Sequence, residues 1–387
     1  MSLPPIAPDA DIERLREEGF DVEVRGAFLL VKGVPYVDAQ RNVLRGILSS
    51  ALERNEFGAP QTHVAYWTGT HPCHSNGSQI SAFFNPSQAQ SLGEGIQADH
   101  TFSAKAAYRD FHHKMCTYIA RIEGEAQVID PSANARTFPV RVADSTETVF
   151  KYEDWASARA NLGAYNDKLA NLRVGIVGVG GTGAYVLDLL AKSRVREMHL
   201  FDGDRFKQHN AFRAPGAASL DDLAGAPPKV THWEAVYGRM RNGVVPNPGM
   251  LEAEGLSALD ELDFVFLCLD AGATKRAVVD HLERADKPFI EVGMGVVRGD
   301  AGLSGLVRVV TSTQGERERA RAHMSFSEGE VENEYSTNIQ IVELNALSAA
   351  LAVIRFKKLF GFYADSASDY YEGYSIRSGD LVKETAA

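Results

Sequence analysis

The chain has 387 residues and a formal net charge of -11 at pH 7, with 44% hydrophobic and 24% charged residues, the composition of an ordinary globular protein long enough for two domains. The acidic balance argues against a nucleic-acid surface, because phosphate binding needs clustered lysines and arginines. No run approaches the roughly 20 apolar residues that span a bilayer, and residues 1–11 lack the basic and apolar segments of a signal peptide. We therefore expect neither nucleic acid nor a membrane as a partner. We also expect a cytoplasmic location.

The first 150 residues are expected to form a smaller mixed α/β domain. Apolar residues at helical spacing predict a core helix over residues 108–122. The patterns before it predict, in chain order, one or two strands, a short amphipathic helix, a loop and a further strand: residues 26–37, 43–52, 68–77 and 80–84.

The second domain is expected to cover residues 151–387, entered through a polar, helical segment at 144–168. A strand, a helix and a second strand would form a βαβ unit, and further buried strands with helices between them indicate a Rossmann-like, doubly wound sheet. A charged segment at 314–338 predicts a mobile crossing loop, and a long amphipathic helix is expected after it. The predicted elements are strands at 174–177, 198–201, 264–269, 288–292 and 306–310 and helices at 184–191 and 339–360.

Three glycines, Gly178, Gly180 and Gly183, form a G-x-G-x-x-G pattern between the first strand of the βαβ unit and its helix. Such glycines permit a tight turn and let phosphates approach the N–H groups of the helix N-terminus, where the dipole favours negative charge. Asp202 ends the next strand, where a carboxylate can accept ribose hydroxyls. A purely structural turn and an NAD-dependent oxidoreductase fit these residues equally well.

The segment after Asp202 separates these alternatives. Asp204 completes an Asp-Gly-Asp sequence, Asn210 and Arg213 follow eight and eleven residues after Asp202, and Lys229 ends a Gly-Ala-Pro-Pro-Lys sequence. With the Gly-Val-Gly-Gly-Thr-Gly loop, this order resembles the ThiF/MoeB and ubiquitin-activating adenylyltransferase family. A later strand that ends in Asp270, followed by Lys275 and Arg276, matches the family's strand–Asp segment. The resemblance covers roughly residues 160–360, and five ordered elements make it far more specific than the glycines alone.

The resemblance implies an enzyme that binds ATP and Mg²⁺ and adenylates a carboxylate. Cations must neutralise the charge that develops as a carboxylate attacks the α-phosphorus, a carboxylate is a ligand that Mg²⁺ accepts, and an arginine ahead of the first strand reaches the partner subunit's nucleotide in family members. The implied nucleotide-binding residues are Gly178, Gly180, Gly181, Thr182, Gly183, Asp202 and Asp204; the implied catalytic residues are Asn210, Arg213, Lys229, Arg159 and Asp270, the last of these also the Mg²⁺ ligand.

The chain departs from ubiquitin-activating enzymes at the acyl-transfer step. Those enzymes pass the acyl group to a cysteine beyond the fourth strand, whereas residues 293–387 contain no cysteine and Cys268 lies in a predicted buried strand. The adenylate would therefore go directly to another protein, to a thiol of the first domain such as Cys73, or to a hydroxyl such as Ser312. The serines in or near the crossing segment are Ser304, Ser312, Ser325, Ser327 and Ser336.

Metal-binding patterns are weak in this sequence. None of the three cysteines belongs to a CxxC pair, so the zinc site of the thiamine and molybdopterin members is not expected, which favours protein conjugation over sulfur-carrier synthesis. Six histidines lie within 51 residues of the first domain, at a spacing that matches no standard metal site, and satisfied loop histidines are the preferred interpretation. These histidines are His63, His71, His74, His100, His112 and His113.

The function expected from these observations is ATP-dependent adenylation of the C-terminal glycine carboxylate of a ubiquitin-like protein, by a homodimer. A conjugating-type enzyme is a second candidate partner, with the first domain as a recruiting module. An NAD-dependent oxidoreductase leaves Asn210, Arg213, Lys229 and Asp270 unexplained. A non-catalytic scaffold that binds nucleotide would tolerate the loss of Asp270.

Overall fold

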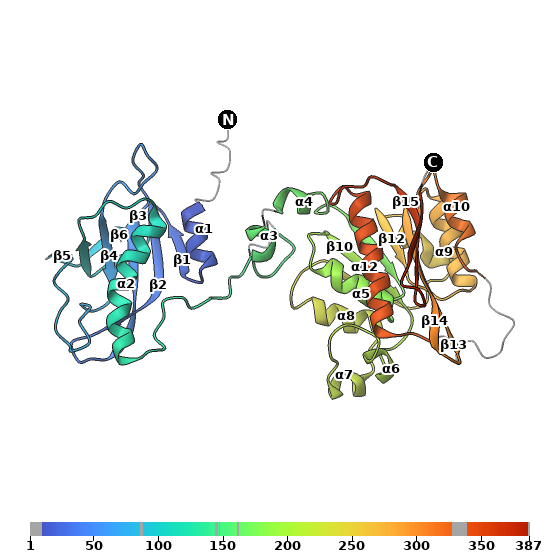
Figure 1. Cartoon of the computed structure of the whole chain (residues 1–387), viewed down its shortest axis with the longest axis horizontal. Helices are drawn as coiled ribbons and strands as arrows, with labels where there is room; N and C mark the ends of the chain where they lie inside the picture. Colours follow the sequence, from blue (N-terminus) through green and yellow to red (C-terminus); the bar gives the residue numbers. More distant parts are fainter. Residues whose placement is uncertain are drawn as a thin grey trace. The chain divides into compact units, whose positions relative to one another are not determined.

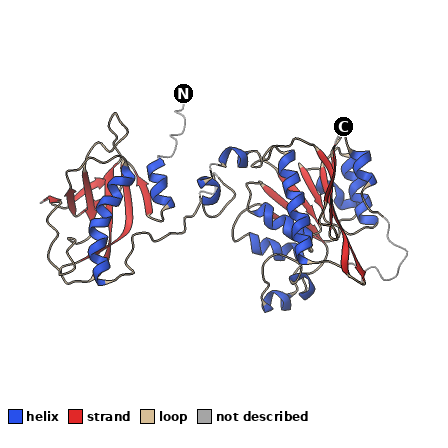
Figure 2. Ribbon diagram, viewed as in Figure 1, coloured by secondary structure: helices blue, strands red, loops and turns tan. Residues whose placement is uncertain are grey.

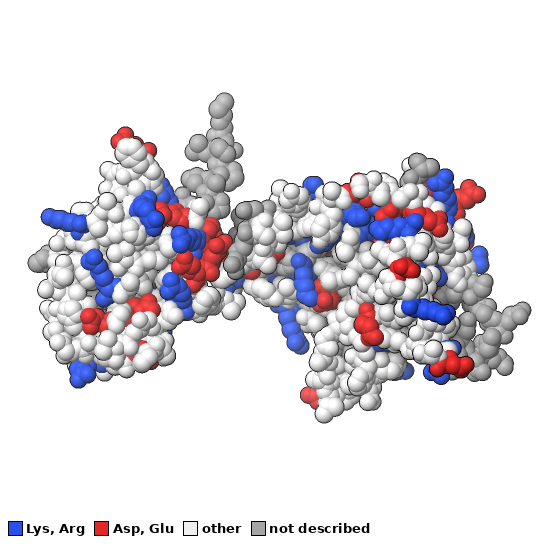
Figure 3. Space-filling view, viewed as in Figure 1, with Lys and Arg blue, Asp and Glu red and all other residues white. Residues whose placement is uncertain are grey.

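A computed structural model describes residues 10–85, 88–143, 146, 148–160, 162–326 and 339–385. The chain divides into two compact units, Met1–Val140 and Arg141–Ala387 (Figure 1). Acidic and basic side chains are interspersed over the face of each unit shown in Figure 3, in keeping with exposed ion pairs such as Arg14–Glu18 and Lys192–Asp188. Among the described residues, no helix has both the length and the hydropathy to cross a bilayer.

The first unit is an antiparallel sheet packed against helix α2 (Figure 2). The strand order is β1-β2-β3-β4-β8-β5, and a separate hairpin pairs β6 with β7. Buried aromatic side chains from the sheet and α2, among them Trp67, Phe102 and Tyr118, form the core. The elements are α1 (Ala10–Glu17), β1 (Asp21–Arg25), β2 (Phe28–Val37), β3 (Val43–Ala51), β4 (Val64–Thr68), β5 (Phe84–Asn85), β6 (Gln90–Gly93), β7 (Ile96–Ala98), β8 (His100–Ser103) and α2 (Phe111–Ile129).

Two predictions for this unit are wrong. The segment expected to be a short helix is strand β3, hydrogen-bonded to β2 on one side and β4 on the other. A side chain at Gly46 would lie 2.3 Å from the Trp67 ring, so this glycine, a poor helix former, allows close cross-strand packing. Of residues 80–84, only Phe84 lies in a strand, because the segment before it turns at residues 82–83 with Ile80 and Phe83 buried in the core.

Helix α2 confirms the predicted core helix but begins and ends later than expected. The Asp110 carboxylate accepts a hydrogen bond from the His113 backbone N–H at 2.6 Å, so it caps the N-terminus. Lys114 on this helix is fully buried, and its ammonium donates to Ser50 Oγ and to the Thr62 and Val64 carbonyls at 2.7–2.8 Å. It therefore ties α2 to β3 and β4.

Lys114 predicts a pH dependence of stability. Burial lowers its pKa to about 8, whereas an unfolded lysine titrates near 10.4. Between these values the unfolded chain binds more protons, so the free energy of unfolding should rise with pH, by at most about 3 kcal/mol. Chemical denaturation of the first unit's transition at pH 7 and pH 10 should show this rise in the native chain and not in Lys114→Met; an equal rise in both would contradict it.

The second unit is built on an eight-stranded sheet in the order β11-β10-β9-β12-β13-β14-β15-β16. The strands from β11 to β13 are parallel to one another and the last three pairings are antiparallel. Helices α5, α8 and α12 contribute to the core on one face, and α9 and α10 to the core on the other (Figure 1). The Rossmann-like doubly wound prediction is thus confirmed.

The observed strands and helices of the second unit overlap those predicted for it from the sequence. The strands are β9 (Arg173–Val177), β10 (Glu197–Asp202), β11 (Val244–Pro248), β12 (Phe264–Leu267), β13 (Phe289–Gly299), β14 (Gly302–Ser312), β15 (Asp369–Ser375) and β16 (Leu381–Thr385). The helices are α3 (Trp155–Arg159), α4 (Gly163–Asp167), α5 (Thr182–Ala191), α6 (Gln208–Ala211), α7 (Leu220–Gly225), α8 (Lys229–Tyr237), the 3-10 helix η1 (Ala253–Leu259), α9 (Ala273–Arg284), α10 (Arg317–Ala322) and α12 (Val342–Leu359).

Two connecting segments differ from expectation. The entry segment 144–168 holds only the short helices α3 and α4 among its described residues. The predicted crossing loop contains helix α10, because Ala320 is fully buried and Arg321 pairs with Asp280 and Glu283 of α9. Residues 327–338 of this loop lie outside the described residues.

Candidate nucleotide-binding site

The glycine loop turns from β9 into helix α5 at the carboxyl edge of the parallel strands. Gly178 has a φ of +86°, and a Cβ there would lie 2.5 Å from the Cys268 carbonyl oxygen. A Cβ on Gly183 would lie 1.8 Å from the Gly178 carbonyl oxygen. Both glycines are therefore required by the turn and by the close approach of β12, whatever the loop binds.

Gly180 differs from these two positions because a Cβ there would meet only ordinary van der Waals contacts. The nearest atoms to a Cβ on Gly180 are Arg213 Nη2 and Lys229 Nζ, each at 3.9 Å. The two cations predicted to neutralise phosphate charge thus converge on the middle of the glycine loop. Backbone N–H groups at a helix start and two cations are the donors that a polyphosphate requires.

Asp202 and Lys229 form an ion pair beside this loop. The Val179 N–H donates to Asp202 Oδ2 at 2.9 Å, and Lys229 Nζ lies 3.3 Å from Asp202 Oδ1 and 2.7 Å from Asp204 Oδ2. The side chains of Lys229 and Asp202 are 7% and 8% exposed, whereas that of Asp204 is 73% exposed. The Lys229 contact lowers the pKa of Asp204 despite the opposing effect of burial. The buried Lys229–Asp202 ion pair therefore supports the glycine loop, whereas the Asp204 side chain extends into solvent.

Asn210 and Arg213 carry unused donors. Asn210 is 1% exposed on helix α6, and its Oδ1 accepts from the Lys207 backbone N–H at 2.9 Å. Asn210 Nδ2 and Arg213 Nε are buried without a hydrogen-bond partner among the described residues. Buried polar atoms in this state are costly unless a ligand satisfies them, and phosphate or ribose oxygens are acceptors that would do so.

Helix α12 contributes a site residue that the motif did not reveal. Asn345 Oδ1 accepts from Thr182 Oγ1 at 2.9 Å, and its Nδ2 donates to the Arg213 carbonyl at 3.2 Å. A Cβ on Gly181 would lie 2.4 Å from this Nδ2. Asn345 therefore joins the glycine loop to the Arg213 segment. Its signal in the sequence is weak, because Asn345 is one of several polar residues on the buried face of α12, beside Ser348 and Arg355.

The family comparison decides between the two nucleotide-binding classes. Residues 156–381 match the model of the ThiF family, and residues 10–155 match a domain of unknown function, DUF6791. The chain belongs to the ThiF family. As a member of this family it is an adenylating enzyme that uses ATP, so the oxidoreductase alternative loses its support.

No curated protein matches the chain. Among solved structures, E. coli MccB with MccA-N7isoASN is similar over 59% of this chain and 70% of that one, at 19% identity and a TM-score of 0.45. E. coli MccB with ATP is similar over 57% and 66%, at 22% identity and a TM-score of 0.45. Selenomethionine PaaA is similar over 57% and 75%, at 19% identity and a TM-score of 0.42.

Asp270 lies exposed just beyond β12, the parallel neighbour of β9. The carboxyl ends of parallel strands meet at one edge, so Asp270 shares the edge that carries the glycine loop. Lys275 of α9, at 2% exposure, and Glu291 of β13, at 0%, form a buried ion pair, and Arg308 joins Glu291 at 3.1 Å. An exposed carboxylate at this edge fits a Mg²⁺ ion shared with phosphates.

The remaining predicted site residues are scattered. Cys73 is 1% exposed, and burial raises the pKa of its thiol. Ser312 is fully buried at the end of β14, with its Oγ unpartnered within the described residues. Arg159 ends helix α3, but its side chain lies outside the described part, as do Ser327 and Ser336. In this conformation neither Cys73 nor Ser312 presents its nucleophile to solvent.

Proposed function

We propose that the protein adenylates the C-terminal glycine carboxylate of a ubiquitin-like protein, releasing pyrophosphate. The observation that carries this proposal is the convergence of Arg213 and Lys229 on the open position of Gly180. The attacking carboxylate is already an anion, so the reaction needs no general base but does need cations at the phosphates. Residues 151–387 would form the adenylation domain, and residues 1–150 would recruit the partner or a conjugating-type enzyme.

Each side chain has a role that its position allows. Arg213, with an unused Nε, and Lys229 would hold the phosphates, Asn210 Nδ2 would donate to a phosphate or ribose oxygen, and Asp202 and Asp204 would accept ribose hydroxyls. Asp270 would hold Mg²⁺, which neutralises phosphate charge when bound. Arg159 would complete the site of a second subunit in a cytoplasmic homodimer.

The same site chemistry admits a shorter substrate. MccB, one of the similar proteins, forms a complex with N-formylated MccA. A peptide carboxylate would present the same anion to the nucleotide, so the catalytic residues alone do not choose between a peptide and a folded protein. Missing CxxC pairs and the additional first unit favour a protein substrate in a conjugation system.

The test is ATP–pyrophosphate exchange with Mg²⁺ and a panel of ubiquitin-like proteins and short peptides. We expect exchange that depends on one partner's terminal glycine and disappears when that glycine is deleted or when Asp270 is replaced by alanine. Exchange with short peptides alone would replace the ubiquitin-like substrate by a peptide. Exchange that survives Asp270→Ala would show that Asp270 is not the Mg²⁺ ligand. Tight NAD binding without any exchange would overturn the proposal of adenylation.

A further inference from the structure

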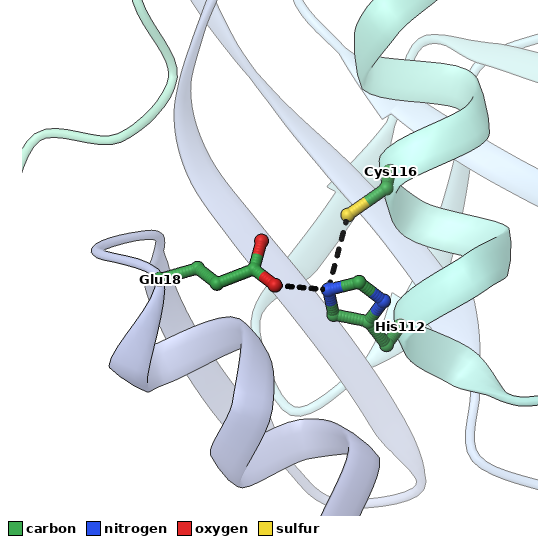
Figure 4. Close-up of side chains that lie close together, drawn as sticks. All are labelled: Glu18, His112 and Cys116. Atoms are coloured by element: carbon green, nitrogen blue, oxygen red, sulfur yellow. Dashed lines mark hydrogen bonds and ion pairs between the residues drawn. The ribbon is translucent and has the colours of Figure 1, made fainter.

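Three potential metal ligands meet where helix α1 ends against the start of helix α2. His112 and Cys116 stand one turn apart on α2, and Glu18 follows α1 directly (Figure 4). His112 Nε2 lies 2.9 Å from Glu18 Oε1 and 3.6 Å from Cys116 Sγ, and the three ligand atoms all lie within 4.8 Å of one another. The His112 side chain is 11% exposed.

Hydrogen bonding alone does not satisfy this cluster. One imidazole nitrogen faces both a carboxylate oxygen and a sulfur, as the two dashed lines in Figure 4 show. A protonated Nε2 donates a single hydrogen, which the 2.9 Å contact assigns to Glu18, so the sulfur receives at most a weak, shared bond. An unprotonated Nε2 could accept from the thiol but would then face the carboxylate lone pairs. A cation at the common point would bind all three lone pairs.

The separations suit a small tetrahedral metal ion. Zinc bonds of about 2.3 Å to sulfur and about 2.0 Å to nitrogen place two tetrahedral ligands about 3.5 Å apart, close to the 3.6 Å between Cys116 Sγ and His112 Nε2. The 2.9 Å between His112 and Glu18 needs only a small outward rotation of the partly exposed carboxylate. Sulfur, imidazole and carboxylate together favour zinc over magnesium or calcium, which prefer oxygen ligands.

We propose that Glu18, His112 and Cys116 form a zinc site in the first unit, with a water molecule as the fourth ligand. Binding forms a bond from each ligand atom to Zn²⁺ as zinc-bound waters leave. It breaks the Cys116 S–H bond and any His112 Nε2–H bond, and both protons pass to solvent while His112 Nδ1 carries the ring hydrogen of the neutral imidazole. The site does not depend on the nucleotide site, because all three ligands belong to the first unit.

Zinc would have to replace contacts that Glu18 makes with two arginines and the proton of the Cys116 thiol. Arg14 Nε contacts Glu18 Oε1 and Arg136 Nη2 contacts Glu18 Oε2, each at 3.2 Å, with the two arginines 59% and 40% exposed. Exposed pairs of this kind contribute little, and the Arg136 contact can remain and orient the carboxylate when Oε1 binds metal. Burial raises the pKa of the Cys116 thiol to about 11, which makes it a poor nucleophile in the absence of metal, whereas a coordinating thiol is deprotonated outright.

Other histidines of the region lie in different contacts. His74 pairs with Glu125 at 2.8 Å, and His71 stacks on Phe84 with ring centroids 3.5 Å apart. His113, the neighbour of His112, accepts from the Arg109 N–H at 3.3 Å. The His113 and Cys73 side chains thus provide matched controls of the same chemistry outside the cluster.

The experiment titrates the full chain, freed of metal by chelation, with Co²⁺, and then displaces Co²⁺ with Zn²⁺. We expect one equivalent of Co²⁺ with tetrahedral absorption and a thiolate-to-cobalt charge-transfer band. Cys116→Ser should lose that band, and His112→Gln and Glu18→Gln should weaken Zn²⁺ affinity by at least about tenfold. His113→Gln and Cys73→Ser should leave both readouts unchanged.

Two results would overturn the proposal: no charge-transfer band in the native chain, or a band that survives Cys116→Ser and disappears in Cys73→Ser. Circular dichroism of each metal-free variant shows whether it is folded. Glu18→Gln keeps the size of a partly exposed side chain, so it reports on coordination even if a helix substitution unfolds the unit. Adenylation activity is measured in parallel, and its absence would leave the metal readouts unaffected.

Discussion

Replacing Lys229 with alanine is expected to lower the rate of ATP–pyrophosphate exchange by about 10²- to 10³-fold. This is the usual effect of removing one preorganised group that stabilises charge in a transition state. Lys229 is 7% exposed, and its ammonium stands 3.9 Å from the position that a Cβ on Gly180 would occupy. Because the Lys229 side chain is largely buried, solvent screens its charge only weakly.

The control for this substitution is an exposed lysine of the same segment. Lys207 precedes helix α6 on the surface, and Lys207→Ala should retain exchange within a few-fold. Lys229→Ala with native exchange, in a folded protein, would remove this lysine from the reaction.

A structural role of Lys229 must also be separated from a catalytic one. Removing it leaves Asp202, 8% exposed, without its cation, and an unpaired buried charge costs about 3–5 kcal/mol. Lys229→Ala combined with Asp202→Asn removes this unpaired charge. Asp202→Asn alone measures the loss of the ribose contact. We expect the double variant to regain thermal stability but to exchange far more slowly than Asp202→Asn, whereas exchange equal to that of Asp202→Asn would show that Lys229 acts only through folding.

Local patterns predicted the elements that place the glycine loop. Strand β9, the loop, helix α5 and strand β10 follow each other within 30 residues, residues 173–202, and each has its own signature of apolar period or turn glycine. The ThiF-family match over residues 156–381 then confirmed the resemblance that the spacing of Asp202, Asn210, Arg213 and Lys229 had indicated. The order of these residues along the chain was sufficient to predict the candidate site, because most of its residues come from one continuous segment.

Long-range contacts explain what the sequence did not predict. Strand β3 was expected to be a helix because its apolar spacing fits both periods, and only pairing with β2 and β4 decides between them. Asn345 bonds Thr182 across 163 residues, and Glu18 meets His112 across 94 residues. Nothing in the spacing of such residues marks them as neighbours, so the histidine count alone could not select His112.

The glycine loop provides the second large effect, through a pair of substitutions that separate phosphate binding from folding. Gly180→Ala is expected to lower kcat/KM for ATP by about 10²-fold, because a displacement of about 1 Å in a reacting group has this cost. Among the described residues, the side chains near a methyl group on Gly180 are Arg213 and Lys229, each at 3.9 Å, so the free protein accommodates it. Its melting temperature should therefore match that of the native chain.

Gly183→Ala should lose activity for a different reason. Its methyl group would lie 1.8 Å from the Gly178 carbonyl oxygen and 3.2 Å from Cys268 Cβ, so the turn must open and the loop leaves β12. Overpacking against backbone costs about 1–3 kcal/mol or more, and we expect a lower melting temperature together with the loss of exchange. Differential scanning calorimetry and exchange assays on both variants make the comparison.

The pair is informative because the two outcomes have separate causes. A Gly180→Ala protein that melts like the native chain but binds ATP weakly places the phosphates against the backbone between Arg213 and Lys229. If Gly180→Ala retains full activity, the phosphates lie elsewhere, and the convergence of the two cations on this glycine would have to be explained by their contacts with Asp202 and Asp204 alone. A Gly183→Ala protein with native stability would contradict the close approach of the start of α5 to the Gly178 carbonyl and to Cys268, on which the geometry of the loop depends.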